Sequence, residues 1–114
     1  MPLTPRQLFY AALSAIGLIA TWYFNLRFIA ESGGTFSVVE FVRAGYANSA
    51  ASSLSNDLAV GTIAFLTWSF AEARRLRIPH WWVFVVLTFG VAFACAFPLF
   101  LFVRERKLAT ATVP

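Results

Sequence analysis

"WWVFVVLTFGVAFACAFPLFLFV", residues 81–103, is 23 residues long and contains no charged side chain. Basic clusters bound it on both sides, "RRLR" at residues 74–77 and "RERK" at residues 104–107. About 20 apolar residues in a helix cross a hydrocarbon core of about 30 Å, and flanking cations anchor such a helix. The sequence therefore predicts a membrane-spanning helix over residues 81–103, with Trp81 and Trp82 as interfacial anchors.

Pro98 lies within this predicted helix. Its ring removes one backbone donor, so either the last turn bends there or a neighbouring side chain meets the freed carbonyl. We expect a kink at Pro98. The kink would turn Arg104 toward the end of the preceding helix that carries Asp57.

The composition of the whole chain also indicates a bilayer. Of its 114 residues, 60% are hydrophobic and 12% are charged, whereas soluble domains contain about 25% charged residues. The nine Lys and Arg residues give a net charge of +4, but they lie in short clusters beside apolar segments, as membrane anchors do, and form no basic stripe for nucleic acid. One cysteine, Cys95, excludes an internal disulfide.

A second apolar segment covers residues 8–29 and is 22 residues long, enough to span. A secretory signal is the alternative, because Arg6 precedes the segment. The apolar stretch is too long for a signal, however, and "GLIATW" offers no small-x-small cleavage site. We therefore expect a retained helix over residues 8–29.

The middle of the chain is less regular. Strictly apolar sequence covers only residues 58–71, but the small residues of "ANSAASSLSND" just before it allow a helix over residues 49–76. The alternative is a shorter helix that Asn56 or Asp57 caps at the interface. Residues 30–48 are then a return loop, in which Gly33 and Gly34 end the first helix and a short amphipathic piece lies on the membrane surface or packs over the end of the bundle.

The predicted fold is thus an all-α membrane protein in a single domain, residues 1–114. It has three transmembrane helices, a short amphipathic segment between the first two, and a basic tail over residues 104–114. The cations of the loop at residues 74–80 place that loop and the N-terminus in the cytoplasm. With three crossings, the nine cations divide into four on that side and five on the other.

The second helix carries the clearest candidate site. At about 100° per residue, a carboxylate stands at each end of a stripe of small residues and one indole. Such a stripe predicts a ligand-binding or interface face, whereas simple pairing of its carboxylates with arginines is the structural alternative. We expect Arg104 to pair with Asp57, and Arg75 with Glu72. The candidate residues are Asn25 from the first helix and Asp57, Gly61, Ala64, Trp68 and Glu72.

Four segments carry a family resemblance: "WYFNLRF" (residues 22–28), "NDLAVGTIAFLTWSFAEARRL" (56–76), "WW" (81–82) and "FPLFLFVRER" (97–106). Over about residues 8–107 the chain resembles a family of small bacterial integral-membrane proteins catalogued as a domain of unknown function. The resemblance implies a bacterial three-helix protein of the inner (cytoplasmic) membrane. It supplies no activity.

No catalytic constellation emerges from the sequence, and we do not expect an enzyme. His80 is the single histidine, and no Ser-His-Asp set, glycine-rich phosphate loop or metal cluster can be assembled. Three hypotheses remain. The first is an accessory or scaffolding subunit of a larger membrane assembly, with a membrane-protein partner or a second copy. The second is a binding protein for a carotenoid, retinoid, quinone or lipid. The third is an oligomeric proton-coupled carrier that uses Asp57 or Glu72.

Overall fold

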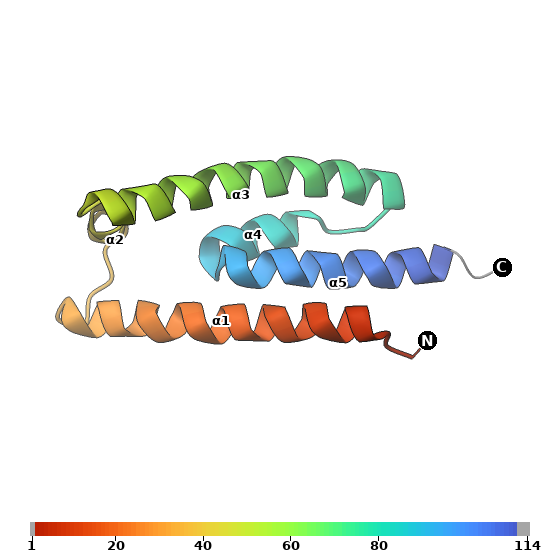
Figure 1. The fold of residues 1–114 in the computed structure, drawn as a ribbon, viewed down its shortest axis with the longest axis horizontal. Coiled ribbons are helices and arrows are strands. Elements are labelled where there is room, and N and C mark those ends of the chain that lie inside the picture. The colour runs from red at the N-terminus through yellow and green to blue at the C-terminus, as the bar shows by residue number, and fades with distance from the viewer. Residues whose placement is uncertain (1, 112–114) are drawn as a thin grey trace.

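The computed structural model describes residues 2–111, and the regular structure of these residues is entirely α-helical. The predicted all-α class is therefore confirmed. The long helices lie along the longest axis of a molecule that measures 56 × 25 × 24 Å (Figure 1). In chain order the helices are α1 (Pro5–Glu31), α2 (Val38–Ala44), α3 (Ser49–Leu76), α4 (Trp82–Gly90) and α5 (Phe93–Ala111).

α1 begins and ends at recognisable sequence signals. The Thr4 hydroxyl accepts a hydrogen bond from the Gln7 amide (3.1 Å) and the Gln7 side chain accepts one from the Thr4 amide (3.3 Å), which makes a capping box. Gly33 and Gly34 follow the helix with φ of 79° and 88°, a conformation that glycine adopts without strain. α1 is therefore a little longer at each end than the predicted residues 8–29.

Side-chain caps also determine where α2 and α3 begin. Ser37 accepts a hydrogen bond from the Glu40 amide (3.3 Å), and the Asn48 side chain accepts one from the Ala51 amide (2.8 Å). The cap of α3 is thus Asn48, and the alternative of a short helix capped at Asn56 or Asp57 is wrong. α3 has the bounds of the longer alternative, residues 49–76, and ends at Arg77 in a left-handed conformation (φ 56°).

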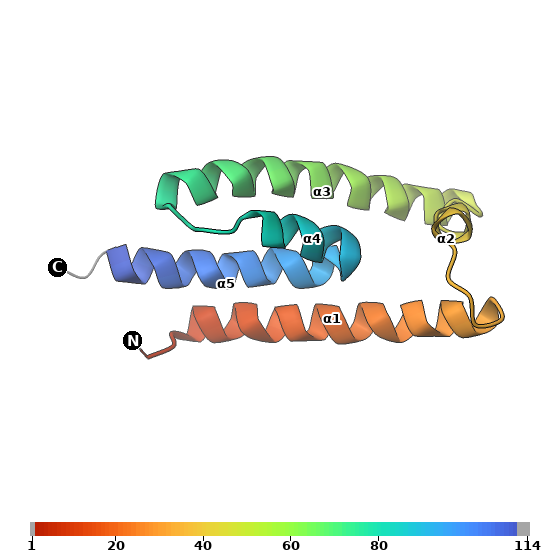
Figure 2. The same ribbon diagram turned by 180° about the vertical axis from the view of Figure 1, so that it is seen from behind.

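Residues 81–103 do not form one helix, so the prediction of a third continuous span is wrong. α4 ends at Gly90, where the Leu87 carbonyl accepts hydrogen bonds from the amides of both Val91 (3.0 Å) and Ala92 (2.8 Å). The chain then reverses, and α5 lies beside α4 (Figures 1 and 2). The nine residues of α4 rise only about 14 Å, less than half of a hydrocarbon core.

The reversal occurs at Val91 and Ala92, not at Pro98. α5 continues through Pro98 to Ala111, and most of the predicted tail at residues 104–114 is helical. The predicted turning of Arg104 toward Asp57 is wrong, because Arg104 pairs with Glu72, whereas the kink itself stays a prediction. Pro98 cannot donate to the carbonyl of Ala94, four residues before it. That carbonyl lies against Gly17 of α1, where an added Cβ would stand 2.2 Å from the carbonyl oxygen.

Two side chains of α1 donate hydrogen bonds to carbonyls near the reversal. The Trp22 indole N–H donates to the Val91 carbonyl (2.7 Å), and the Ser14 hydroxyl donates to the Cys95 carbonyl (2.9 Å). The Val91 carbonyl lies between α4 and α5, where backbone groups lack helical partners, and burying such a group unpaired costs free energy. With the contact at Gly17, these bonds form a docking seam between α1 and the hairpin of α4 and α5.

α5 is the central element of the bundle, in contact with α1, α4 and α3. The core lies on the α3 side of it: Phe100 is fully buried, and its ring meets Phe84 edge-on with centroids 5.1 Å apart. Phe65 of α3 completes this aromatic cluster, 5.9 Å from Phe100. The reversal of the chain is what brings Phe84 and Phe100 together.

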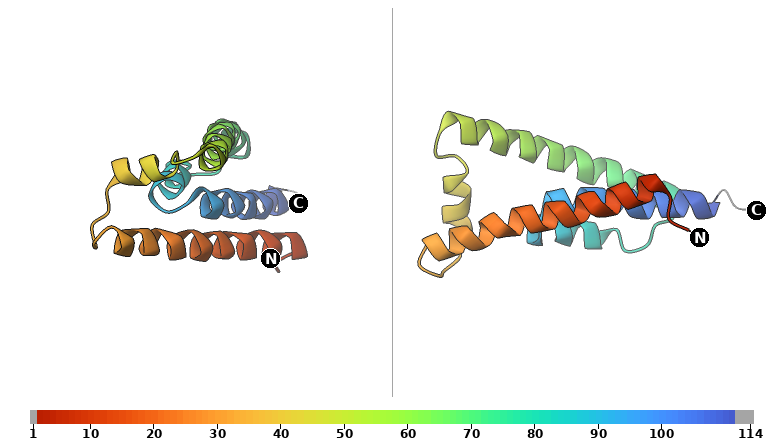
Figure 3. Two further views of the ribbon diagram at one scale, coloured as in Figure 1. Left: turned by 60° about the vertical axis from the view of Figure 1, so that its left-hand side comes forward. Right: turned by 60° about the horizontal axis from the view of Figure 1, so that its bottom comes forward.

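The two ends of the bundle differ. At one end, which we call the terminal end, Arg6 of α1 lies 3.7 Å from Glu105 of α5, and Arg104 pairs with Glu72 of α3. At the other end α2 lies across the adjoining ends of α1 and α3 (Figure 3). The Asn25 end of α1 and the Asp57 end of α3 therefore lie far from Arg104, contrary to the three-span prediction.

Candidate functional site

An open groove between α3 and α5 contains the middle of the predicted stripe. The groove has a volume of about 320 Å³. We call it the aromatic groove, because four of its six lining residues are aromatic. It is lined by Gly61, Ala64, Phe65 and Trp68 of α3 and by Phe93 and Phe97 of α5.

The aromatic walls are ordered by ring contacts. Phe97 stacks on Phe65 (centroids 4.7 Å apart) and on Phe93 (5.6 Å). On the α3 side, Gly61 and Ala64 have small side chains that leave space above the helix backbone. A Cβ added at Gly61 would meet only the edge of the Phe93 ring, at 4.0 Å. The groove can therefore accept an apolar group close to the α3 backbone.

A charged cluster stands at the terminal end of the groove. Glu72 is buried, and its carboxylate accepts two hydrogen bonds from Arg75, at 2.7 Å and 3.1 Å. The same carboxylate accepts a further bond from Arg104 of α5. The Arg104 guanidinium also lies over the Trp68 ring, 5.6 Å from its centroid. The cluster thus ties α5 to α3 and closes one end of the groove with fixed charges.

The comparisons with known proteins can be set beside this geometry. A family model described as "Protein of unknown function DUF2834" matches residues 9–106. The chain belongs to this family. No curated protein and no solved structure matches it. The matched range of this DUF2834 chain includes the whole aromatic groove and the Glu72 cluster.

The structure places only part of the predicted site together in this DUF2834 member. Gly61, Ala64 and Trp68 line the groove, and Glu72 stands at its end with Arg75, the partner predicted for it. Arg104 pairs with Glu72 and not with Asp57, so that predicted pair is wrong. Asp57 is exposed and Asn25 is partly buried, and neither lines the groove.

Sequence reasoning did not single out Phe93 and Phe97, which form the α5 wall of the groove. Phe93 and Phe97 are four residues apart, one helical turn, and so share a face. That spacing is visible in the sequence. Because residues 81–103 were predicted to form one continuous helix, the sequence did not show which helix this face would contact. Only the reversal at Val91 turns these two rings toward Phe65 of α3.

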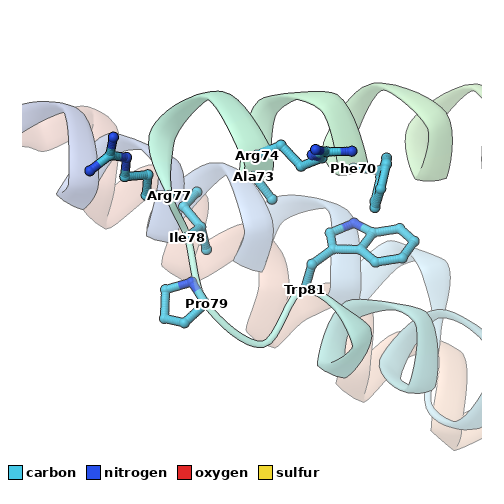
Figure 4. A pocket seen from close by; sticks show the side chains of 7 residues that line it. All are labelled: Phe70, Ala73, Arg74, Arg77, Ile78, Pro79 and Trp81. Carbon is cyan, nitrogen blue, oxygen red and sulfur yellow. The ribbon is translucent and has the colours of Figure 1, made fainter.

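A second hollow of about 380 Å³ lies where α3 meets the loop to α4 (Figure 4). We call it the basic hollow, because two arginines and no carboxylate line it. Arg77 and Pro79 stand on one side, Phe70 and Trp81 on the other, with Ile78 and Ala73 between them. Its lining residues are Phe70, Ala73, Arg74, Arg77, Ile78, Pro79 and Trp81.

Proposed function

We propose that this DUF2834 member is an integral-membrane subunit, with α1 and α3 as spanning helices and α4 and α5 as a re-entrant hairpin. Exposed apolar side chains carry this proposal. Among residues 2–111, 24 large hydrophobic side chains are exposed, whereas eight hydrophobic residues form the buried core. Such a surface is unfavourable in water and matches a hydrocarbon environment.

The individual helices support this arrangement to different degrees. Of the helices that the structure describes, α1 alone is both long and apolar enough to span by length and composition. α3, at 28 residues, rises about 42 Å and exposes Leu54, Leu58, Val60 and Ile63 over two of its turns. α4 and α5 are re-entrant in this proposal, since the chain enters and leaves at the terminal end.

The hairpin also changes the charge balance between the two ends. With both termini on one side, seven of the nine cations belong to the terminal end, and Arg27 and Arg43 belong to the α2 end. By the positive-inside rule, we expect the terminal end to lie on the cytoplasmic side of a bacterial inner membrane. The cations at that end are Arg6, Arg74, Arg75, Arg77, Arg104, Arg106 and Lys107.

Single thiols test this topology sharply. In a Cys95→Ala background, Arg77→Cys and Thr110→Cys stand on opposite sides of the membrane if residues 81–103 span, and on the same side if they are re-entrant. We expect both thiols to resist a membrane-impermeant maleimide in intact cells and to react after lysis, while Arg43→Cys reacts from outside. Labelling of Thr110→Cys alone from outside would overturn the hairpin topology.

Within the membrane, we propose an accessory or scaffolding role. The small core leaves the outer faces of α1 and α3 free, and Gly61 and Ala64 let another helix approach the α3 backbone closely. In this reading the aromatic groove receives a transmembrane helix of a partner protein or of a second copy.

The four aromatic walls favour a second candidate, a flat apolar ligand such as a carotenoid, retinoid, quinone or lipid tail. A proton-coupled carrier ranks third. Its exchanging carboxylate must be free to take up a proton, whereas Glu72 accepts hydrogen bonds from both Arg75 and Arg104. Asp57, the other carboxylate predicted for this role, is exposed and lies outside the groove.

Purification in mild detergent separates these candidates. A stoichiometric co-purifying membrane protein, or a stable homo-oligomer, supports the scaffolding role, and an extracted chromophore or quinone supports the ligand. Gly61→Leu should abolish whichever association is found, because its side chain would occupy the floor of the groove. Ala59→Leu, at an exposed position outside the groove, is the matched control and should behave as the native protein. Equal behaviour of the two variants would remove the groove from the proposal.

A further inference from the structure

The basic hollow has features that its neighbouring charged cluster lacks. Arg75 and Arg104 are both occupied by Glu72. By contrast, Arg74 and Arg77 pair with no carboxylate among residues 2–111, although Arg74 lies over the Phe70 ring at 5.7 Å. Two exposed cations therefore stand beside the hollow without a counter-charge from the described part of the chain.

The floor and one wall of the hollow are apolar and held in place. Ala73 and Ile78 are buried, and the Ile78 amide donates to the Ala73 carbonyl (2.8 Å), which fixes the turn after α3. The Trp81 indole N–H donates to the hydroxyl of fully buried Ser69 (2.9 Å), and its ring meets Phe70 edge-on at 5.0 Å. The indole is thus a fixed wall.

We propose that the basic hollow binds the headgroup of an acidic glycerophospholipid, with Arg74 and Arg77 supplying positive charge from its two sides and Phe70 and Trp81 along the first part of an acyl chain. The inference rests on the proposed membrane placement, in which this end of α3 lies at the cytoplasmic interface. Arginine pairs well with phosphate oxygens, and tryptophan favours the headgroup level. Charge complementarity and the apolar wall together select a lipid over a soluble anion.

Native mass spectrometry of the detergent-purified full chain tests the proposal. The protein is incubated with equal amounts of phosphatidylglycerol and phosphatidylcholine that carry the same acyl chains. We expect preferential retention of phosphatidylglycerol. Because each arginine near a lipid surface adds on the order of 1 kcal/mol to the attraction, the double variant Arg74→Gln/Arg77→Gln should reduce this preference about thirtyfold.

The matched control is Arg27→Gln/Arg43→Gln, which removes the same charge at the α2 end and should keep the preference. Equal loss in both double variants would show a net-charge effect and overturn the site, as would equal retention of the two lipids by the native chain. Displacement of phosphatidylglycerol by millimolar inorganic phosphate would show a free-anion site instead of a lipid site. If thiol labelling supports the topology while lipid preference is absent, the inference fails and the proposed function stands.

Discussion

Contacts that hold the hairpin together join residues distant in the sequence, whereas contacts around α2 join near neighbours. In the hairpin region, by which we mean α4, α5 and the parts of α1 and α3 that touch them, Ser14 bonds Cys95 and Glu72 pairs with Arg104. In the α2 region, by which we mean α2 and the adjoining ends of α1 and α3, the Tyr46 hydroxyl donates to Asn56 (3.0 Å) and Glu40 pairs with Arg43.

This difference has an energetic meaning. The hydrogen bonds around α2 are local and mostly exposed, so each contributes little and the region depends on its helix caps. The hairpin contacts are buried or half-buried, and each lost partner leaves a polar group or a cavity behind. The proposed groove and the Glu72 cluster both depend on the hairpin region, so substitutions there should have the larger effects.

The largest effect is expected from Gly17→Leu. Even a Cβ at this position would stand 2.2 Å from the Ala94 carbonyl oxygen, so α1 and α5 must separate. Overpacking of this kind costs about 1 to 3 kcal/mol and sometimes more, and we expect the upper part of that range. Thermal unfolding in detergent measures the loss. Ala20→Leu, at an exposed position of α1, is the control and should unfold as the native protein. Similar melting of the two variants would mean that the docking seam does not hold the hairpin.

Paired carboxylate substitutions sharpen the comparison between the regions. Glu72→Gln removes the charge that Arg104 faces at a half-buried site, and we expect a loss of about 2 kcal/mol in the free energy of unfolding. Asp57→Asn changes an exposed carboxylate that has no partner among residues 2–111, and its unfolding should be unchanged. Denaturation of both variants in the same detergent gives the comparison. A greater loss for Asp57→Asn would mean that the carboxylate of the α2 region, and not Glu72, contributes more to the stability of the fold.

The smallest effect is expected from Pro98→Ala. α5 already continues through Pro98, so the substitution restores one amide without moving Arg104. The free energy of unfolding should change by less than about 1 kcal/mol, well below the usual cost of an interior proline, because the helix continues on both sides of Pro98. A Glu72→Gln/Pro98→Ala double variant tests independence, and the two effects should add. Strong non-additivity would mean that Pro98 does position Arg104.

Much of the secondary structure could be predicted because its signals are local. The pair Gly33 and Gly34 and the small residues before Asp57 lie within a turn or two of the helix end that they affect. The capping box of Thr4 and Gln7 is equally local, but the predicted start at residue 8 did not use it. The stripe of Gly61, Ala64 and Trp68 follows from helical spacing alone, and the structure places all three in one groove. Periodicity can select the face of a helix without any knowledge of its partner.

The reversal at Val91 could not be predicted in the same way. Residues 81–103 have the length and composition of a spanning helix, and Gly90 is a weak breaker in an apolar run. What favours the hairpin is non-local: Phe84 on Phe100, Trp22 on the Val91 carbonyl, and Gly17 against the Ala94 carbonyl. The formation of a hairpin, instead of one continuous helix, determines that Arg104 pairs with Glu72. It also determines where the α5 wall of the groove lies.

The sequence by itself determined an all-helical, strongly apolar chain, the end of the first helix at Gly33 and Gly34, the start of α3 at residue 49, and the α3 face with small residues and an indole. These depend on side-chain chemistry within one helix or one cap. Only the tertiary structure decided that the last apolar run folds back on itself, since that outcome depends on contacts between residues distant in the sequence, such as Ser14 and Cys95, which are 81 positions apart. The hairpin is favoured by the burial of aromatic rings and by hydrogen bonds to backbone carbonyls, both between different helices. Neither contribution can be inferred from the residue pattern of one segment.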